Sequence, residues 1–117
     1  MATFVLVHGA MHGGWCWRDV RRRLAQRGYD VHGPTLSGQG DRRGGLTPDV
    51  GVLTHVQDLE ELLWFEDLSD VHLVLHSYAG ILAGPLAERA EERLASVVYL
   101  GAFVHRTRPE PSRRRAP

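Results

Sequence analysis

The sequence has no lysine, no asparagine and only one cysteine, Cys16, among its 117 residues. A single cysteine excludes a disulfide within the chain and suits a reducing cytoplasm. No apolar run reaches the roughly 18 residues that a membrane-spanning helix needs. The first residues also lack the basic region and the cleavage site of a secretory signal. These absences predict a cytoplasmic protein without a membrane partner.

Neither sign of charge is in excess, because fourteen arginines balance fourteen acidic residues. Bulk attraction to nucleic acid is therefore not expected. Residues 106–117 nevertheless hold five arginines against one acid, together with three of the six prolines. Such a composition is typical of disorder, so we expect a domain over residues 1–104 and a disordered tail over residues 105–117. A basic arm for nucleic acid is the less favoured alternative.

Strand-like and helix-like patterns alternate along the domain. Strands are expected at residues 3–7, 29–32, 71–75 and 96–103, with helical spacing of apolar residues between them. The order β-α-β-α-β-α-β predicts an α/β fold with a mostly parallel sheet of about four strands and helices on both faces. The apolar run 71–75 indicates a strand that is covered on both sides.

Three local patterns make sharper predictions about the helices. Thr54, with Gln57 three residues later, predicts a helix that begins with Thr54 as its N-cap. Pro85 falls eight residues into a helical pattern over about 78–93, so that helix is expected to bend. Trp15 and Trp17 are expected to pack the first helix against the sheet.

Two motifs follow strands and are expected to meet at the carboxyl edge of the sheet, where open α/β folds bind ligands. In residues 75–80, LHSYAG, Ser77 stands where a strand turns directly into a helix, close to the helix N-terminus. In the first loop, Gly9 permits a tight turn that lets the next amide point inward. The backbone amides of Ala10 and Tyr78 would then form a two-donor oxyanion hole.

The sequence resembles the α/β-hydrolases over about residues 3–104. The segments that carry the resemblance are FVLVHGAMHGGWCW (4–17), THVQD (54–58), EDLSDVHLVLHSY (66–78) and VVYLGAF (97–103). They are especially similar to the branch that holds plant methyl esterases, hydroxynitrile lyases and bacterial esterase-like proteins. In that branch Ser77 matches the nucleophile, and the amides of Ala10 and Tyr78 match the oxyanion donors.

The resemblance implies hydrolysis of a small-molecule carboxylic ester through an acyl-serine, with no cofactor and no metal. The family's catalytic acid and histidine follow later, in a domain of roughly 200–250 residues. We therefore expect a partial α/β-hydrolase fold, truncated and inactive alone. One alternative is a non-catalytic pseudo-hydrolase fragment or binding module. A hydroxynitrile lyase is less favoured, because residue 9 is glycine where the lyases of this branch carry a hydroxyl.

Departures from the family pattern also carry predictions. Leu75 and Ala79 replace the glycines of Gly-x-Ser-x-Gly, and Leu75 is expected to crowd the turn at Ser77.

The histidines do not predict a metal site: His72 and His76 would stand about 13 Å apart on a strand, and His8 and His12 have no nearby Cys or carboxylate pair. His105 as a substitute base is less favoured than an exposed residue. The unpaired edge of the last strand predicts self-association.

Overall fold

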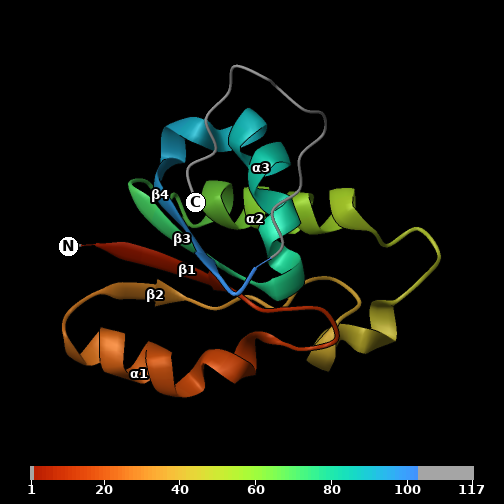
Figure 1. The fold of residues 1–117 in the computed structure, drawn as a ribbon, viewed down its shortest axis with the longest axis horizontal. Helices are drawn as coiled ribbons and strands as arrows, with labels where there is room; N and C mark the ends of the chain where they lie inside the picture. Colours follow the sequence, from red (N-terminus) through yellow and green to blue (C-terminus); the bar gives the residue numbers. More distant parts are fainter. Residues whose placement is uncertain (1, 103–117) are drawn as a thin grey trace.

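The four strands form one parallel sheet in the order β2-β1-β3-β4 (Figure 1). The computed structural model describes residues 2–102. The predicted α/β sheet is confirmed, with α1 on one face and α2 and α3 on the other. The strands are β1 (Thr3–Val7), β2 (Asp30–His32), β3 (Val71–His76) and β4 (Leu94–Leu100), and the α-helices are α1 (Arg18–Gln26), α2 (Val52–Phe65) and α3 (Ala83–Ala90).

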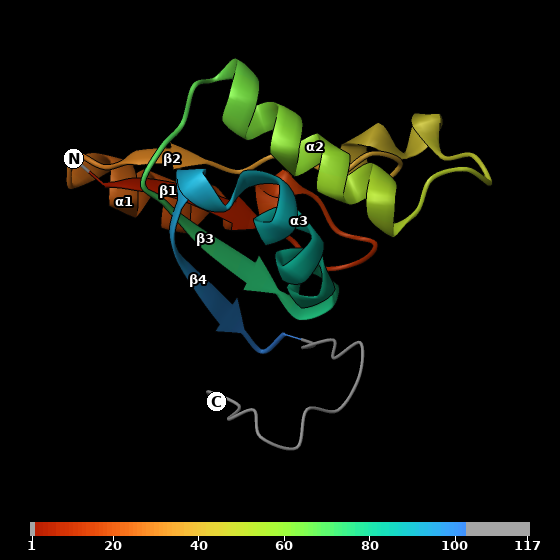
Figure 2. The ribbon, with the colours of Figure 1, turned by 90° about the horizontal axis from the view of Figure 1, so that it is seen from above.

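The hydrophobic core lies between the sheet and the pair α2 and α3 (Figure 2). Val71, Leu73 and Leu75 of β3 point into this core and are fully buried. The residues that alternate with them along β3 are only half-buried. Both faces of β3 are covered, as predicted, but the face opposite the core is covered less closely. A strand presents alternate residues to opposite faces, and only one face here meets closely packed helices.

Helix α1 packs loosely and contains no buried residue. Val20 is 42% exposed, whereas Trp17, just before the helix, is buried and its ring meets the His76 ring of β3 edge-on. Trp15 is 49% exposed, so the expectation that both tryptophans pack beneath the helix is wrong for Trp15. The helix ends as its sequence predicts, because Gly28 adopts a φ of +89°, a conformation that glycine permits. Within residues 2–102 no helix combines the length and apolar character needed to traverse a bilayer.

The helix starts differ from their sequence signals. Helix α2 begins two residues before the predicted N-cap: Gly51 is the cap, and the Thr54 hydroxyl accepts a hydrogen bond from the Gly51 amide at 3.0 Å. Thr54 therefore completes the first turn instead of opening it. The pattern over 78–93 is divided into a 3₁₀ segment, Ser77–Leu82, the α-helix α3 and a 3₁₀ turn, Glu91–Arg93. The predicted bend within one continuous helix is therefore not found, because regular α-helix begins only at Ala83, two residues before Pro85.

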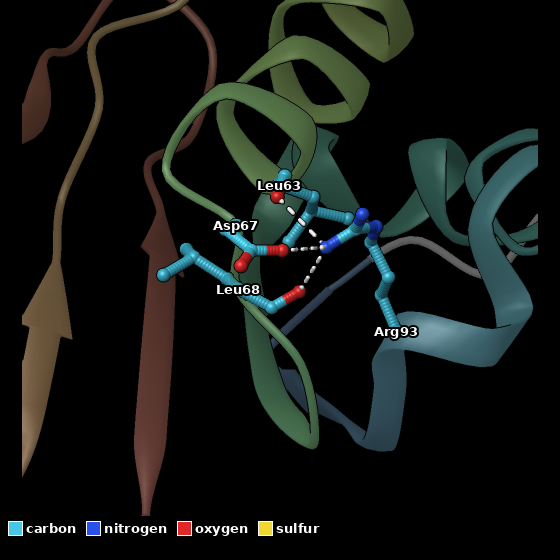
Figure 3. Close-up of polar contacts among 4 residues, drawn as sticks. All are labelled: Leu63, Asp67, Leu68 and Arg93. Carbon is cyan, nitrogen blue, oxygen red and sulfur yellow. Dashed lines mark hydrogen bonds and ion pairs between the residues drawn. The ribbon is translucent and has the colours of Figure 1, made fainter.

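Arg93, just before β4, joins that strand to the end of α2 (Figure 3). One guanidinium nitrogen donates to the carbonyls of Leu63 at 3.2 Å and Leu68 at 2.8 Å, and it lies 3.4 Å from the Asp67 carboxylate. The Leu63 carbonyl is among the last of α2, where a cation also offsets the negative end of the helix dipole. This contact fixes the start of β4 beside β3. The predicted strand 96–103 begins two residues earlier, at Leu94, and ends at Leu100; Phe103, His105 and the predicted tail lie outside the described residues.

Candidate active site

Ser77 occupies a sharp turn at the carboxyl end of β3. Its φ is +55°, in the left-handed region that costs a non-glycine residue of order 1–3 kcal/mol. Ser77 is half-buried, and the residues two before and two after it, Leu75 and Ala79, are fully buried in the core. The Leu75 side chain thus points into the core on the side of α2 and α3. We refer to this strained strand-to-helix turn as the elbow.

The loop after β1 lies directly against this turn. A Cβ atom placed on Gly9 would stand 3.1 Å from the Cβ of Ser77 and 3.4 Å from Nδ1 of His76. A side chain at residue 9 would therefore crowd Ser77, and glycine leaves the two loops free to lie this close. Strands β1 and β3 are neighbours, with Val7 opposite Leu75, so the two loops leave the sheet at the same level. Ala10, which follows Gly9, is exposed, and its amide belongs to the loop that faces Ser77.

His8 is fully buried and holds this loop to the next one. Its Nε2 accepts a hydrogen bond from the Leu36 amide at 2.9 Å, so the ring proton resides on Nδ1, which donates to the Gly9 carbonyl at 2.6 Å. Burial lowers the pKa of His8 below its usual value of 6.5. His8 is therefore a neutral structural group, with both nitrogens engaged.

A second buried histidine, His55 of α2, contacts the elbow. His55 Nδ1 lies 2.8 Å from the Tyr78 hydroxyl, and its Nε2 lies 2.9 Å from the Ser37 carbonyl. Since a carbonyl only accepts, Nε2 carries the proton and Nδ1 accepts from Tyr78. The amide and hydroxyl of Ser37 both donate to Asp58, at 2.6 and 2.7 Å. Burial raises the pKa of the Tyr78 phenol above 10, which keeps its hydroxyl a donor.

Sequence reasoning missed the roles of His55, Ser37 and Asp58. One signal was present: His55 is a polar residue beside the apolar stripe Val56, Leu59 and Leu63, and a buried polar group needs a partner. The partners themselves come from segments about twenty residues away along the chain, at separations of 18, 21 and 23 residues. No local pattern specifies such pairings.

The loop after β2 is tied down by further polar contacts. The Gly14 amide donates to the Thr35 hydroxyl, which donates to Asp41, both at 2.8 Å. Arg42 donates to the Thr35 carbonyl at 2.8 Å, and the Met11 amide donates to the Gln39 side chain at 2.6 Å. Asp41 therefore serves the local loop conformation, as its position in a glycine-rich stretch predicts. These contacts hold the loops around Ser77 in one arrangement.

Within residues 2–102 the Ser77 hydroxyl is not hydrogen-bonded to a base. No hydrogen bond to its hydroxyl is found there, and His8 and His55 use both ring nitrogens elsewhere. The His12 ring packs against Trp15 at a tilt of 54°, with the ring centroids 4.6 Å apart. The histidine–carboxylate contact of this part of the chain joins His32 to Asp30 on β2, away from the elbow. Among the same residues, no three His, Cys, Asp or Glu side chains are grouped to hold a metal ion.

Comparison with known proteins agrees with this geometry. The family model described as the alpha/beta hydrolase family matches residues 4–117. The carbendazim hydrolyzing esterase of Nocardioides sp. (strain SG-4G) is 45% identical over 104 residues, which cover 89% of this chain and 43% of that protein. Methylesterase 4 of Arabidopsis thaliana is 35% identical over 93% of this chain and 42% of its own length.

Solved structures show the same partial coverage. A pyrethroid hydrolase from Sphingobium faniae JZ-2 superposes with a TM-score of 0.75 and 30% identity, over 86% of this chain and 40% of that one. An extracellular alpha/beta-hydrolase from a Paenibacillus species gives a TM-score of 0.81 at 24% identity, over 90% and 42% of the two chains. The chain thus spans about two fifths of the length of the relatives it matches. By its sequence and its fold, this chain belongs to the alpha/beta hydrolase family.

Proposed function

We propose that Ser77 is the nucleophile of a carboxylic ester hydrolase and that the backbone amides of Ala10 and Tyr78 form its oxyanion hole. The observation that carries the proposal is the contact between the Ser77 turn, at a φ of +55°, and the glycine loop, where a Gly9 Cβ would lie 3.1 Å from Ser77. This arrangement brings a serine hydroxyl and two backbone turns together at the carboxyl edge of a parallel sheet.

The reaction follows from these groups. The Ser77 oxygen attacks the ester carbonyl, and the negative charge that develops on the carbonyl oxygen is stabilised by the two amides. Collapse of this intermediate expels the alcohol and leaves an acyl-serine, which water then cleaves to the carboxylic acid and free Ser77. A base must take the serine proton and return it to the alcohol, and within residues 2–102 none is hydrogen-bonded to Ser77.

We therefore propose that the 117-residue chain is inactive alone and corresponds to a truncated hydrolase, whose acid and histidine would come from sequence outside these residues. The named relatives, a carbendazim hydrolyzing esterase and a methylesterase, support esters of small molecules as the substrate class. The absence of a side chain at Gly9 argues against a lyase that needs a hydroxyl there. The exposed thiol of Cys16 supports a location in the reducing cytoplasm.

A chimera tests the proposed function. Residues 1–102 of this chain are joined to the part of the carbendazim hydrolyzing esterase that follows its matched segment, and hydrolysis of 4-nitrophenyl acetate is measured. We expect turnover by the chimera, its loss in Ser77→Ala, and none above buffer for the 117-residue chain. A folded chimera without turnover would overturn the assignment and favour a non-catalytic binding module.

A further inference from the structure

Beside the edge strand β2 lies a cleft that the proposed function does not use. It has a volume of about 380 Å³ and is lined by Trp15, Arg18, Arg21, Arg22, Ala25 and Val31. We refer to it as the α1 cleft, because four of these residues belong to that helix. Figure 1 shows α1 lying along the sheet next to β2. Two strand spacings, about 10 Å, separate β2 from β3, the strand that ends just before Ser77.

The cleft concentrates positive charge that has no internal partner. Arg21 and Arg22 lie three and four residues after Arg18, so both lie on the same face of α1 as Arg18. Within residues 2–102, the ion pairs of arginine join Arg89 to Glu60 and Arg93 to Asp67, and none involves these three. Asp19, the one acid of α1, lines the neighbouring hollow with Arg22, Arg23 and Gln26.

This placement is unfavourable for the helix in the absence of an anion. Arginines three and four residues apart repel one another, and Arg18 opens the helix at the positive end of its dipole. The chain as a whole is electrically neutral, yet residues 18–27 carry five arginines against one acid. An anion in the cleft would offset both the mutual repulsion and the dipole.

The remaining walls suit a flat apolar group. Trp15 is 49% exposed, and its ring is held at 4.6 Å from the ring of His12. The Arg21 side chain crosses the end of β2, where a Cβ on Gly33 would lie 3.0 Å from its Cδ and 3.4 Å from its Nε. The Arg21 side chain thus lies against the backbone at Gly33, and its planar guanidinium can bind an anion or stack on a ring.

From these observations we propose that the α1 cleft binds a small aromatic anion, with its carboxylate or phosphate on the three arginines and its ring against Trp15, Ala25 and Val31. The site is separate from Ser77. Its volume falls within the range of small-molecule pockets.

Calorimetric titration of the 117-residue chain tests the proposal with four probes: 2-naphthoate, 2-naphthyl phosphate, the neutral 2-naphthalenemethanol and inorganic phosphate. We expect 1:1 binding of at least one aromatic anion that is much tighter than binding of the other two probes. The stronger of the two aromatic anions identifies the head group. Equal binding of inorganic phosphate would indicate an adventitious ion only, and equal binding of the alcohol an apolar surface only; either result, or no binding of the aromatic anions, overturns the proposal.

Matched variants locate the ligand. Arg21→Gln combined with Arg22→Gln should weaken binding about tenfold, because charge-assisted hydrogen bonds are lost. Arg27→Gln, outside the cleft but on the same segment, should leave it unchanged. Trp15→Ala should weaken the aromatic anion but not inorganic phosphate. Ser77→Ala should bind as the wild type, which separates this site from the proposed active site; equal loss in Arg27→Gln, or loss in Ser77→Ala, overturns the proposal.

Discussion

His8 couples the loop after β1 to the pH of the solution. Its Nε2 accepts the Leu36 amide, so protonation of the ring removes this hydrogen bond as well as placing a charge in the core. Burial lowers the pKa of His8 in the folded chain, while the unfolded residue titrates near 6.5. Above that pH both states are neutral at His8, and its contribution to stability is complete. Below it the unfolded chain binds a proton that the folded chain resists.

We predict that the free energy of unfolding falls as the pH drops from 6.5 towards the lowered pKa of folded His8, by up to about 1.4 kcal/mol per pH unit for this one group. Urea unfolding at pH 5.0 to 7.5 measures the slope. His8→Asn and His8→Gln remove the titrating ring and should both flatten the profile over this window. Slopes equal to that of the wild type would show that His8 is not the responsible group.

Arg93 stabilises the fold through backbone carbonyls more than through its ion pair. Asp67 is 92% exposed, and exposed pairs contribute little. The two carbonyls of Leu63 and Leu68 accept charge-assisted hydrogen bonds from a side chain that is only 19% exposed. Arg93→Met should therefore lower the free energy of unfolding by about 1.5–3 kcal/mol, and Asp67→Asn by less than about 0.5 kcal/mol. Urea unfolding compares the two, and equal losses would contradict this division.

Helix α3 shows how a proline decides where a helix can begin. Pro85 is the third residue of α3, where backbone amides have no partner within the helix, so its missing N–H removes no helical bond. The 3₁₀ segment Ser77–Leu82 supplies the preceding turns. The strain at Ser77 and the position of Pro85 together confine regular helix to the residues beyond Leu82.

Pro85→Ala should accordingly change the free energy of unfolding by less than about 1 kcal/mol, as the loss of proline's rigidity in the unfolded chain is the main effect. A proline that broke a continuous helix would cost about 3 kcal/mol, and its removal would stabilise the chain by a similar amount. Gly84→Ala, where an added Cβ meets nothing within 4 Å, should stabilise by about 0.5–1 kcal/mol. A gain near 3 kcal/mol for Pro85→Ala would restore the bent-helix interpretation.

At the scale of the whole molecule, the edge strand β4 is the surface through which copies of the chain are expected to associate. β4 is the last strand in the sheet order, and Val98, Tyr99 and Leu100 are 44%, 44% and 49% exposed. An exposed apolar edge strand is a template for pairing with another strand. We propose that copies of this chain associate through the exposed edge of β4.

Sedimentation of the 117-residue chain should therefore show association that rises with concentration. Val98→Lys combined with Tyr99→Lys should reduce it, because charge on an edge strand opposes pairing. Leu53→Lys, at a residue of α2 that is 64% exposed, is the matched control and should leave association unchanged. A monodisperse wild-type monomer, or an equal effect of the control, would contradict the role of β4.

Much of the fold could be read from local patterns. The alternation of apolar runs predicts four parallel strands, Gly28 predicts the end of α1, and the strand-to-helix junction predicts a sharp turn at Ser77. Each of these signals depends on residues within a few positions of one another. The structure confirms the sheet and places Gly9 against Ser77, since parallel strands bring their carboxyl ends to the same edge.

Other features depend on partners that are distant along the chain. The buried bonds of His8 to Leu36 and of His55 to Tyr78 join residues 28 and 23 positions apart. The exposure of Trp15, the half-covered face of β3 and the helix start at Val52 likewise follow from what packs nearby. Periodicity shows that a side chain prefers burial or a hydrogen bond, but the identity of its partner is settled by the free energy of packing all the elements together.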